Sequence, residues 1–179
     1  IQSGDAVAIM METDPELLAC IAGIVKLGAI AGVLNHNQRD DVLSHSINLI
    51  KPKLIIVSEE CVSALATTPH YPTVDTTAAY YCLAASNKPV PEGFVDFGQA
   101  LATMPDSNPA STNSVTLEQP CFFVFTSGTT GLPKASIMTH YRWLMGMCGV
   151  GLFSARLRSS DVLYVTLPFY HNNALTVSW

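Results

Sequence analysis

Short apolar runs that alternate with helix signals are the feature that most constrains the fold of this chain. Four such runs lie at residues 6–11, 30–34, 53–58 and 121–125. Each is long enough for a buried strand and is bounded by polar or turn-forming residues. Helical segments between successive strands are typical of parallel βαβ crossovers. The alternation therefore predicts an α/β fold, with parallel-strand layers and flanking helices.

The first helical segment begins at Thr13-Asp14-Pro15-Glu16, which supplies a cap side chain, a proline for the first turn and an acid. Apolar residues follow at helical spacing as far as Gly28, a residue suited to a helix C-terminus. A membrane span over residues 17–34 is the weaker interpretation, because the run is short for the required length of about 20 residues. A buried helix is favoured. Asp40 is expected to cap a second helix that extends through Asn48.

The last third of the chain returns to regular structure after residues 121–125. Ala135–Met138 is expected to be the return strand, and Thr139 to cap a helix from His140 to Phe153. Residues 161–167 form another apolar run, which predicts a strand that ends at Pro168. The helix has four candidate core positions, which are Trp143, Leu144, Met147 and Leu152.

Residues 59–119 have a different character. Six prolines lie among Thr, Ser and Ala, with little periodicity. Two interpretations stay open for this segment. It is either an irregular connection that contains a short helix or strand pair, or a variable insertion.

Composition limits the class of protein. Only 13% of the residues are charged and 49% are apolar, whereas soluble domains average about 25% charged residues. Much of the surface is therefore expected to be covered by something else. The chain starts without Met and stops within an apolar run, so we expect a fragment of a longer protein, from its N-terminal part. The net charge of −5 argues against nucleic-acid binding.

The cysteines indicate the compartment. Five cysteines lie far apart, and none belongs to a Cys-x-x-Cys motif. This pattern favours reduced core thiols over a disulfide framework. We therefore expect an intracellular protein, either cytoplasmic or membrane-associated.

The segment Thr126-Ser127-Gly128-Thr129-Thr130-Gly131-Leu132-Pro133-Lys134 carries the strongest chemical signal. It combines four hydroxyl side chains, two glycines and a lysine directly after an apolar strand. Glycine tolerates positive φ, which lets successive backbone N–H groups point at one anion. The hydroxyls add donors, and Lys134 adds a positive charge for a phosphate.

The spacing excludes three better-known loops. A P-loop needs Gly-x-x-x-x-Gly-Lys followed by Ser or Thr, and this segment has neither that spacing nor a Rossmann fingerprint. It is not a nucleophile elbow either, because Phe125 stands where the first glycine should be. For a looser loop of Gly, Ser and Thr, the favoured interpretation would be a flexible hairpin whose hydroxyls only contact water. The exact string in this chain favours a functional loop instead.

Thr126–Lys134 resembles the phosphate-loop signature of the adenylate-forming, or AMP-binding, enzymes. These include acyl-CoA synthetases, adenylation domains of peptide synthetases and luciferases. Leu167-Pro168-Phe169-Tyr170-His171 is similar to the next motif of that family. Leu34-Asn35-His36-Asn37-Gln38-Arg39, with Leu43 and His45, is similar to long- and very-long-chain fatty acyl-CoA synthetases, including fatty-acid transport proteins. Individually, Asn35, Asn37 and Arg39 are better explained as residues that hydrogen-bond a turn.

The resemblance implies that residues 1–179 are a partial N-terminal AMP-binding domain, in which 121–179 hold the phosphate loop and the following motif. The C-terminal domain and the family's later motifs are absent, so the fragment alone is expected to be inactive. The implied whole protein is a ligase. A fatty carboxylate attacks the α-phosphate of ATP, and CoA then displaces AMP from the acyl-adenylate. ATP with Mg²⁺ and CoA are the implied cofactor and co-substrate.

The resemblance also implies roles for individual residues. His171 and Lys134 are expected to act in catalysis, and Tyr170 and His171 to lie on the acyl and adenylate side. No metal ligand is assigned. The residues expected to bind ATP and pyrophosphate are Thr126, Ser127, Gly128, Thr129, Thr130, Gly131 and Lys134.

Two alternative functions stay open. One is an adenylating enzyme for another carboxylic acid, such as an aryl or amino acid. The other is a truncated, non-catalytic nucleotide-binding fragment. The resemblance is compatible with peripheral membrane association of the whole protein, and the residues indicate no particular oligomeric state.

Overall fold

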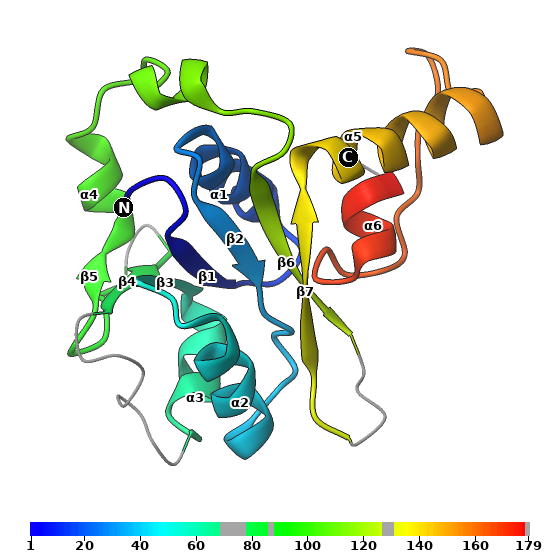
Figure 1. The fold of residues 1–179 in the computed structure, drawn as a ribbon. Helices are drawn as coiled ribbons and strands as arrows, with labels where there is room; N and C mark the ends of the chain where they lie inside the picture. The colour runs from blue at the N-terminus through cyan, green and yellow to red at the C-terminus, as the bar shows by residue number, and fades with distance from the viewer. Residues whose placement is uncertain (69–77, 86–87, 127–130, 178–179) are drawn as a thin grey trace.

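The computed structural model describes residues 1–68, 78–85, 88–126 and 131–177. In these ranges seven strands form one sheet (Figure 1). The strands are β1 Ala6–Met10, β2 Ile30–Val33, β3 Leu54–Ser58, β4 Ala79–Leu83, β5 Val95–Asp96, β6 Pro120–Thr126 and β7 Lys134–Thr139. The α-helices are α1 Pro15–Lys26, α2 Asp40–Ile50, α3 Val62–Leu65, α4 Phe97–Ala102, α5 His140–Cys148 and α6 Asn172–Val177. Glu59–Cys61 and Ala110–Ser114 form 3-10 turns, and Gly149–Ser154 forms a π-helical turn.

The strand order across the sheet is β5-β4-β3-β1-β2-β6-β7. Neighbouring strands are parallel except β6 and β7, which are antiparallel. The α/β fold predicted from the alternation of apolar runs is confirmed. The four strands predicted from those runs are also confirmed, to within one residue at each end.

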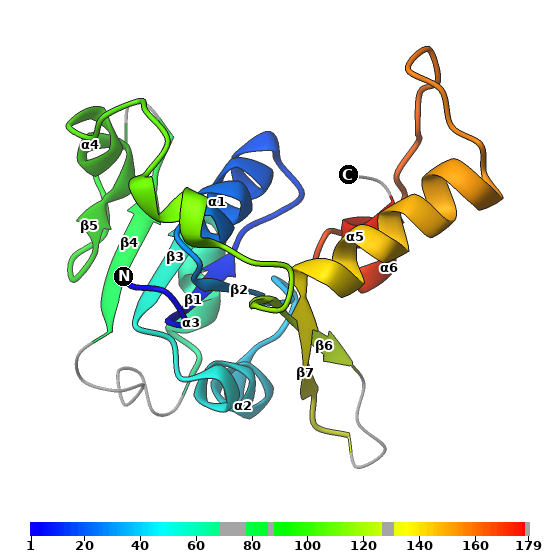
Figure 2. The same cartoon turned by 45° about the horizontal axis from the view of Figure 1, so that its top comes forward.

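Helices cover both faces of the sheet. Along β1, Val7 and Ile9 pack in one core with α1, whereas Ala8 and Met10 pack in a second core with α2 and α3. Figures 1 and 2 show α1 and α2 on opposite sides of the strands. A strand buried on both faces reads as a continuous apolar run, which is why β1 and β3 were recognisable in the sequence.

The crossovers explain this arrangement and locate a crevice. The chain moves from β1 to β2 through α1, and then back past β1 to β3 through α2. Crossovers between parallel strands are right-handed, so a reversal of direction places the next helix on the opposite face. The connections after β1 and β2 therefore leave toward different faces. Ligands of open α/β sheets bind at such a point, outside the carboxyl ends of the strands.

The buried-helix interpretation of α1 is confirmed, and its C-terminus has the predicted glycine. The Gly28 N–H donates to the carbonyl of Val25 at 3.0 Å, and the Ala29 N–H donates to that of Ile24 at 3.2 Å. This is the Schellman pattern. The expected N-terminal cap is wrong in one respect, because the Asp14 side chain makes no capping hydrogen bond. Within the described ranges, no helix is long and apolar enough to span a bilayer.

Gly28→Ala is expected to lower the free energy of unfolding by about 1–2 kcal/mol. Gly28 has φ +73°, and a Cβ there would lie 2.8 Å from Ser3 Oγ. Gly23→Ala, within the same helix, is the matched control, because nothing lies within 4 Å of its Cβ position. That control is expected to stabilise by about 0.5–1 kcal/mol. Denaturant unfolding of the full-length protein measures both, and equal midpoints for the two variants would contradict the assignment.

The second helix begins differently from the prediction. Arg39 occupies the N-cap position, and Asp40 is the first helical residue, with φ 50°. The Asp40 N–H donates to Thr67 Oγ1 at 2.9 Å. The expectation that Asp40 caps the helix is therefore wrong, because the chain enters the helix through a left-handed residue at this position. The helix itself is confirmed and ends at Ile50.

The hairpin of β6 and β7 confirms the predicted return strand. Thr139 caps α5 as expected, since its Oγ1 accepts from the Arg142 N–H at 3.3 Å. The helical course continues through the π-helical turn to Ser154. Of the four expected core positions, Trp143 stacks edge-on against Phe122 and Met147 is half-buried, but Leu144 and Leu152 are exposed.

The predicted strand at 161–167 is wrong. The segment has no strand structure, and the side chains of Val162 and Tyr164 are 95% and 90% exposed. A strand forms only where a neighbouring strand pairs with it. In the described ranges β7 is the outermost strand on this side, and residues 161–167 do not pair with its free edge.

Part of segment 59–119 belongs to the sheet. β4 pairs in parallel with β3, and the short β5 pairs with β4. In the described ranges, a 3-10 turn and α3 precede β4, and α4 and a second 3-10 turn follow β5. The run Ala79–Leu83 is apolar enough for a strand, but the surrounding prolines and hydroxyl residues masked it in the sequence.

Candidate functional site

The Thr126–Lys134 motif connects β6 to β7. Thr126 is the last residue of β6 and Lys134 the first of β7, and the two are paired across the hairpin. Both are exposed. A hydroxyl and a cation therefore stand opposite each other where the loop leaves the sheet. The predicted site residues Ser127, Gly128, Thr129 and Thr130 lie outside the described residues.

Gly131 adopts a conformation that favours glycine. Its φ is +87°, and nothing lies within 4 Å of the position that a Cβ would occupy. The requirement for glycine therefore comes from the backbone angle and not from crowding. This agrees with the expectation that glycines shape the backbone of the loop.

The helix α2 packs against the hairpin of β6 and β7. Phe123, Phe125 and Ala135 pack against the core that contains the buried face of α2. His45 of α2 also makes a polar contact, in which its Nε2 lies 2.9 Å from the carbonyl oxygen of Pro133. This contact was not predictable from the sequence, because the two residues are 88 positions apart.

The second predicted motif folds into a turn that starts α6. Phe169 is buried, Tyr170 is half-buried and His171 is exposed. The His171 N–H donates to the Pro168 carbonyl at 3.0 Å, and the His171 carbonyl accepts from the Leu175 N–H at 3.1 Å. The backbone of His171 is therefore fixed at the start of a helix, while its side chain faces outward.

Three rings form a row at this place. The ring of Tyr170 lies 4.5 Å from that of His171 and meets the ring of His36 edge-on at 5.3 Å. His36 follows β2, so the row joins the loop after β2 to the start of α6. The buried Nδ1 of His36 has no hydrogen-bond partner within the described part of the chain. Sequence reasoning assigned no role to His36.

The structure thus brings together two groups at one edge of the sheet. One is Thr126 with Lys134, after β6, and the other is the ring row, beside the end of β2. β2 and β6 are paired in parallel, so both groups lie at carboxyl ends of neighbouring strands. In the described ranges no hydrogen bond joins the two groups directly.

The turn after β2 confirms the structural interpretation of its polar residues. Asn35 Oδ1 accepts from the Asn37 N–H at 2.9 Å, as in an Asx turn. Arg39 Nη1 donates to the carbonyls of His36 and Gln38, at 2.7 Å each. These residues fix the shape of the turn that carries His36.

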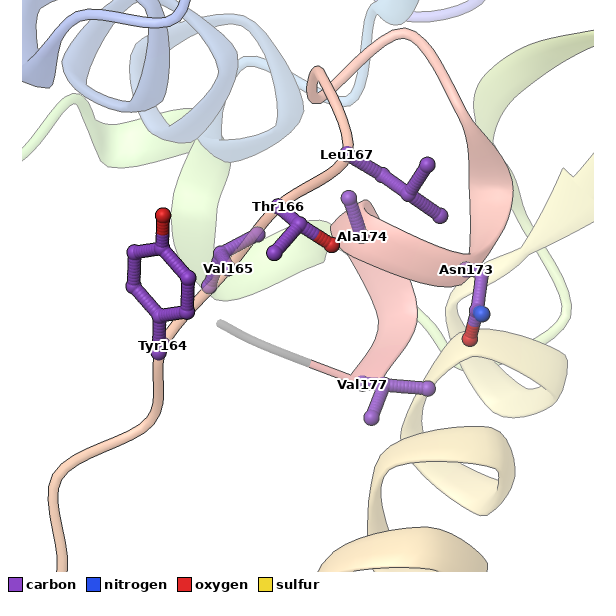
Figure 3. Close-up of a pocket in the computed structure, with 7 residues that line it drawn as sticks. All are labelled: Tyr164, Val165, Thr166, Leu167, Asn173, Ala174 and Val177. Atoms are coloured by element: carbon purple, nitrogen blue, oxygen red, sulfur yellow. The ribbon is translucent and has the colours of Figure 1, made fainter.

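A small pocket lies between residues 164–167 and α6 (Figure 3). Its walls include Leu167 and Ala174, and its volume is about 120 Å³. Pockets for small-molecule ligands usually measure about 300–1,000 Å³. This pocket is therefore too small to hold a fatty acyl chain by itself.

A larger apolar cavity of about 730 Å³ lies between α1, the sheet and α4. Leu27, Ile56 and Leu101 are among its walls. None of the predicted site residues lines it. The cavity is therefore separate from the predicted site residues.

The cysteines take no part in this site. All five are free thiols, as expected. Burial raises the pKa of Cys121 to about 12 and that of Cys20 to about 11. Both therefore stay protonated at neutral pH, and a protonated thiol is a poor nucleophile.

The whole chain matches a known family and several known proteins. The AMP-binding enzyme family matches residues 1–179. The chain is 41% identical over 177 residues to a medium/long-chain-fatty-acid–CoA ligase of Mycobacterium tuberculosis. The match covers 98% of this chain and 27% of that protein. It is 32% identical to long-chain fatty acid transport protein 6 of Mus musculus, over 97% of this chain and 27% of the relative. The chain thus spans about a quarter of the length of these relatives.

Solved structures share the fold. An acyl-CoA synthetase of Brucella canis superposes with a TM-score of 0.80 at 24% identity, over 98% of this chain and 30% of the other. An anthranilate CoA ligase in complex with anthranoyl-AMP gives a TM-score of 0.82 at 22% identity, over 98% and 33%. The match over all 179 residues and the phosphate-loop motif agree: the chain belongs to the AMP-binding enzyme family.

Proposed function

We propose that the protein of which this chain is part is an ATP-dependent fatty-acid–CoA ligase. The observation that carries the proposal is the Thr126–Lys134 motif, which connects β6 to β7 at the carboxyl end of β6 in a mostly parallel sheet. The chain that contains this motif is 41% identical to a protein named as a medium/long-chain-fatty-acid–CoA ligase.

In the first step a carboxylate oxygen of the fatty acid attacks the α-phosphorus of ATP. A bond forms between these two atoms. The bond between the α-phosphorus and the oxygen that bridges to the β-phosphate breaks, and pyrophosphate is released. Negative charge accumulates on the leaving group, so fixed donors and cations around it lower the barrier. Lys134 and the backbone and hydroxyl donors of Thr126–Gly131 supply them. ATP would enter as its Mg²⁺ complex, in which the metal would supply further positive charge to the phosphates.

In the second step the thiol of CoA attacks the carbonyl carbon of the acyl-adenylate. The C–S bond of the thioester forms, the bond from the carbonyl carbon to the AMP oxygen breaks, and AMP and the thiol proton are released. His171, with Tyr170 beside it, faces the carboxylate and the adenylate in this proposal. The support is its fixed backbone at the start of α6, its exposed side chain, and the contact of the neighbouring Tyr170 with His36, which follows β2.

His171→Ala is expected to slow acyl-adenylate formation about 10- to 100-fold, the value of one hydrogen bond to a charged group. Affinity for ATP and the melting temperature are expected to change little, because the side chain is exposed. Single-turnover measurement of adenylate in the full-length protein, together with a melting curve, tests this. Normal adenylation combined with a lower melting temperature would show that His171 is only structural.

The acid class is the point on which the alternatives differ. An anthranilate CoA ligase shares this fold at 22% identity, so the fold does not select between aryl and fatty acids. The sequence relatives favour a fatty acid, since they include fatty-acid ligases and fatty acid transport proteins at 31–41% identity.

Product analysis of the full-length protein tests the proposal. The protein is incubated with MgATP, CoA and one acid at a time, from fatty, aryl and amino acid sets. Equal amounts of acyl-CoA and AMP are expected with medium- or long-chain fatty acids. Thioester from aryl or amino acids alone would favour the alternative acid classes. ATP binding without formation of any product would favour the non-catalytic nucleotide-binding alternative.

We also propose that the protein acts inside the cell, where ATP and CoA are found. Peripheral contact with a membrane would bring the site close to its fatty acid substrate. The fatty acid transport proteins among the relatives support this proposal. Centrifugation of lipid vesicles with the full-length protein tests it, because a protein without membrane affinity stays in the supernatant.

A further inference from the structure

The contact between His45 and Pro133 joins the phosphate-loop motif to a helix on the second face of the sheet. His45 is half-buried in α2, and its Nε2 lies 2.9 Å from the carbonyl oxygen of Pro133. A carbonyl oxygen only accepts, so Nε2 must carry the proton. Nothing in the local sequence around either residue requires this contact.

Pro133 directly precedes β7. In the described ranges the pairing of β6 and β7 ends at Thr126 and Lys134. Pro133 is half-buried, and a buried backbone carbonyl oxygen is stabilised by a hydrogen-bond donor. His45 provides one directly before the lysine that begins β7.

The helix that carries His45 is itself well fixed. Leu43 and Ile47, on either side of His45, are fully or almost fully buried, and they share a core with Phe125 and Ala135 of the hairpin. The imidazole therefore projects from a rigid support toward the arm that follows Gly131. An anchor of this kind restricts the backbone next to Lys134.

We propose that His45 is a positioning residue, which holds residues 131–134 so that Lys134 meets the phosphates of ATP. This assignment rests on the proposed function of the motif. His45 touches no reacting atom, and its effect passes through Pro133. Its loss is therefore expected to weaken the use of ATP and to leave the use of the fatty acid unchanged.

The test compares three variants of the full-length protein: His45→Ala, His45→Gln and Asn48→Ala. The Gln side chain offers an amide donor at a similar reach. Asn48 is the matched control, since it lies on the same helix, is exposed, and donates to Ser44 and not to the hairpin. The readouts are KM for ATP, KM for the fatty acid, and amide hydrogen exchange of residues 131–137 without ligands.

His45→Ala is expected to raise KM for ATP about 3- to 10-fold, the value of one neutral hydrogen bond. Hydrogen exchange in residues 131–137 should become faster, and KM for the fatty acid should stay the same. His45→Gln should restore both measurements, and Asn48→Ala should change neither. Unchanged exchange and unchanged KM for ATP in His45→Ala would overturn the proposal, as would a Gln variant as impaired as the Ala variant.

Hydrogen exchange distinguishes a failure of this proposal from a failure of the proposed function. Faster exchange in a protein that does not activate fatty acids would refute the function and keep the anchor. Active enzyme with normal exchange would keep the function and refute the anchor.

Discussion

Thr129→Val combined with Thr130→Val, in the full-length protein, is expected to slow acyl-adenylate formation about 100- to 10,000-fold. Valine keeps the shape of threonine and removes the hydroxyl. Each lost hydrogen bond to a charged phosphate costs about 1.5–3 kcal/mol, and two such losses multiply in the rate. The effect should be present with every acid that the protein accepts, because the loop contacts the phosphates and not the acid.

The control for this double variant is Thr166→Val, which makes the same chemical change outside the motif. Thr166 lines the small pocket beside α6, and its loss is expected to leave the use of ATP unchanged. Single-turnover formation of adenylate at saturating fatty acid, followed over a range of ATP concentrations, measures both variants. A wild-type rate in the double variant would show that the motif does not contribute to the use of ATP.

Phe122→Ala is expected to lower the free energy of unfolding by about 3–5 kcal/mol. Phe122 is fully buried in β6, and its ring meets that of Trp143 edge-on at a centroid distance of 4.9 Å. Removal of the ring leaves a cavity between the sheet and α5, at the strand that leads into the phosphate-loop motif. Partial collapse of that cavity would also displace Thr126, so activity should fall with stability.

Phe153→Ala is the matched control for this core substitution. Phe153 is 77% exposed in this chain, and its removal is expected to change stability by about 0.5 kcal/mol or less. Thermal and denaturant unfolding of the full-length protein compare the two. Similar losses for both variants would contradict the burial described for Phe122.

The parallel core of the fold was predictable because burial leaves a local trace. β1, β2 and β3 are buried on both faces, so their residues form short apolar runs without alternation. Gly28 likewise marked the end of α1, since a left-handed position there favours glycine. These features depend on neighbouring residues alone.

The errors arose where a structure depends on distant partners. Residues 161–167 have the composition of a strand, yet they have no strand beside them in the described chain, and Val162 and Tyr164 remain exposed. Conversely, β4 lies in a proline-rich region and forms because β3 offers an edge to pair with. Apolar content alone does not distinguish these cases.

The candidate site likewise has one part that the sequence predicts and other parts that depend on distant partners. The phosphate-loop motif is a continuous string, and its position between two strands followed from the sequence. The ring row of His36, Tyr170 and His171 did not follow from it, because it needs the start of α6 to pack beside the loop after β2. The contact from His45 to Pro133 needs α2 to pack against the hairpin. Both contacts join residues that are far apart in the sequence, so only the three-dimensional arrangement reveals them.

Exchange of labelled pyrophosphate into ATP, without CoA, is the measurement that tests the central claim most directly. It reports reversible formation of the acyl-adenylate and so isolates the step that the phosphate loop serves. The full-length wild-type protein is expected to catalyse exchange only when a medium- or long-chain fatty acid is present. Exchange driven by aryl or amino acids alone, or no exchange with any acid, would contradict the account.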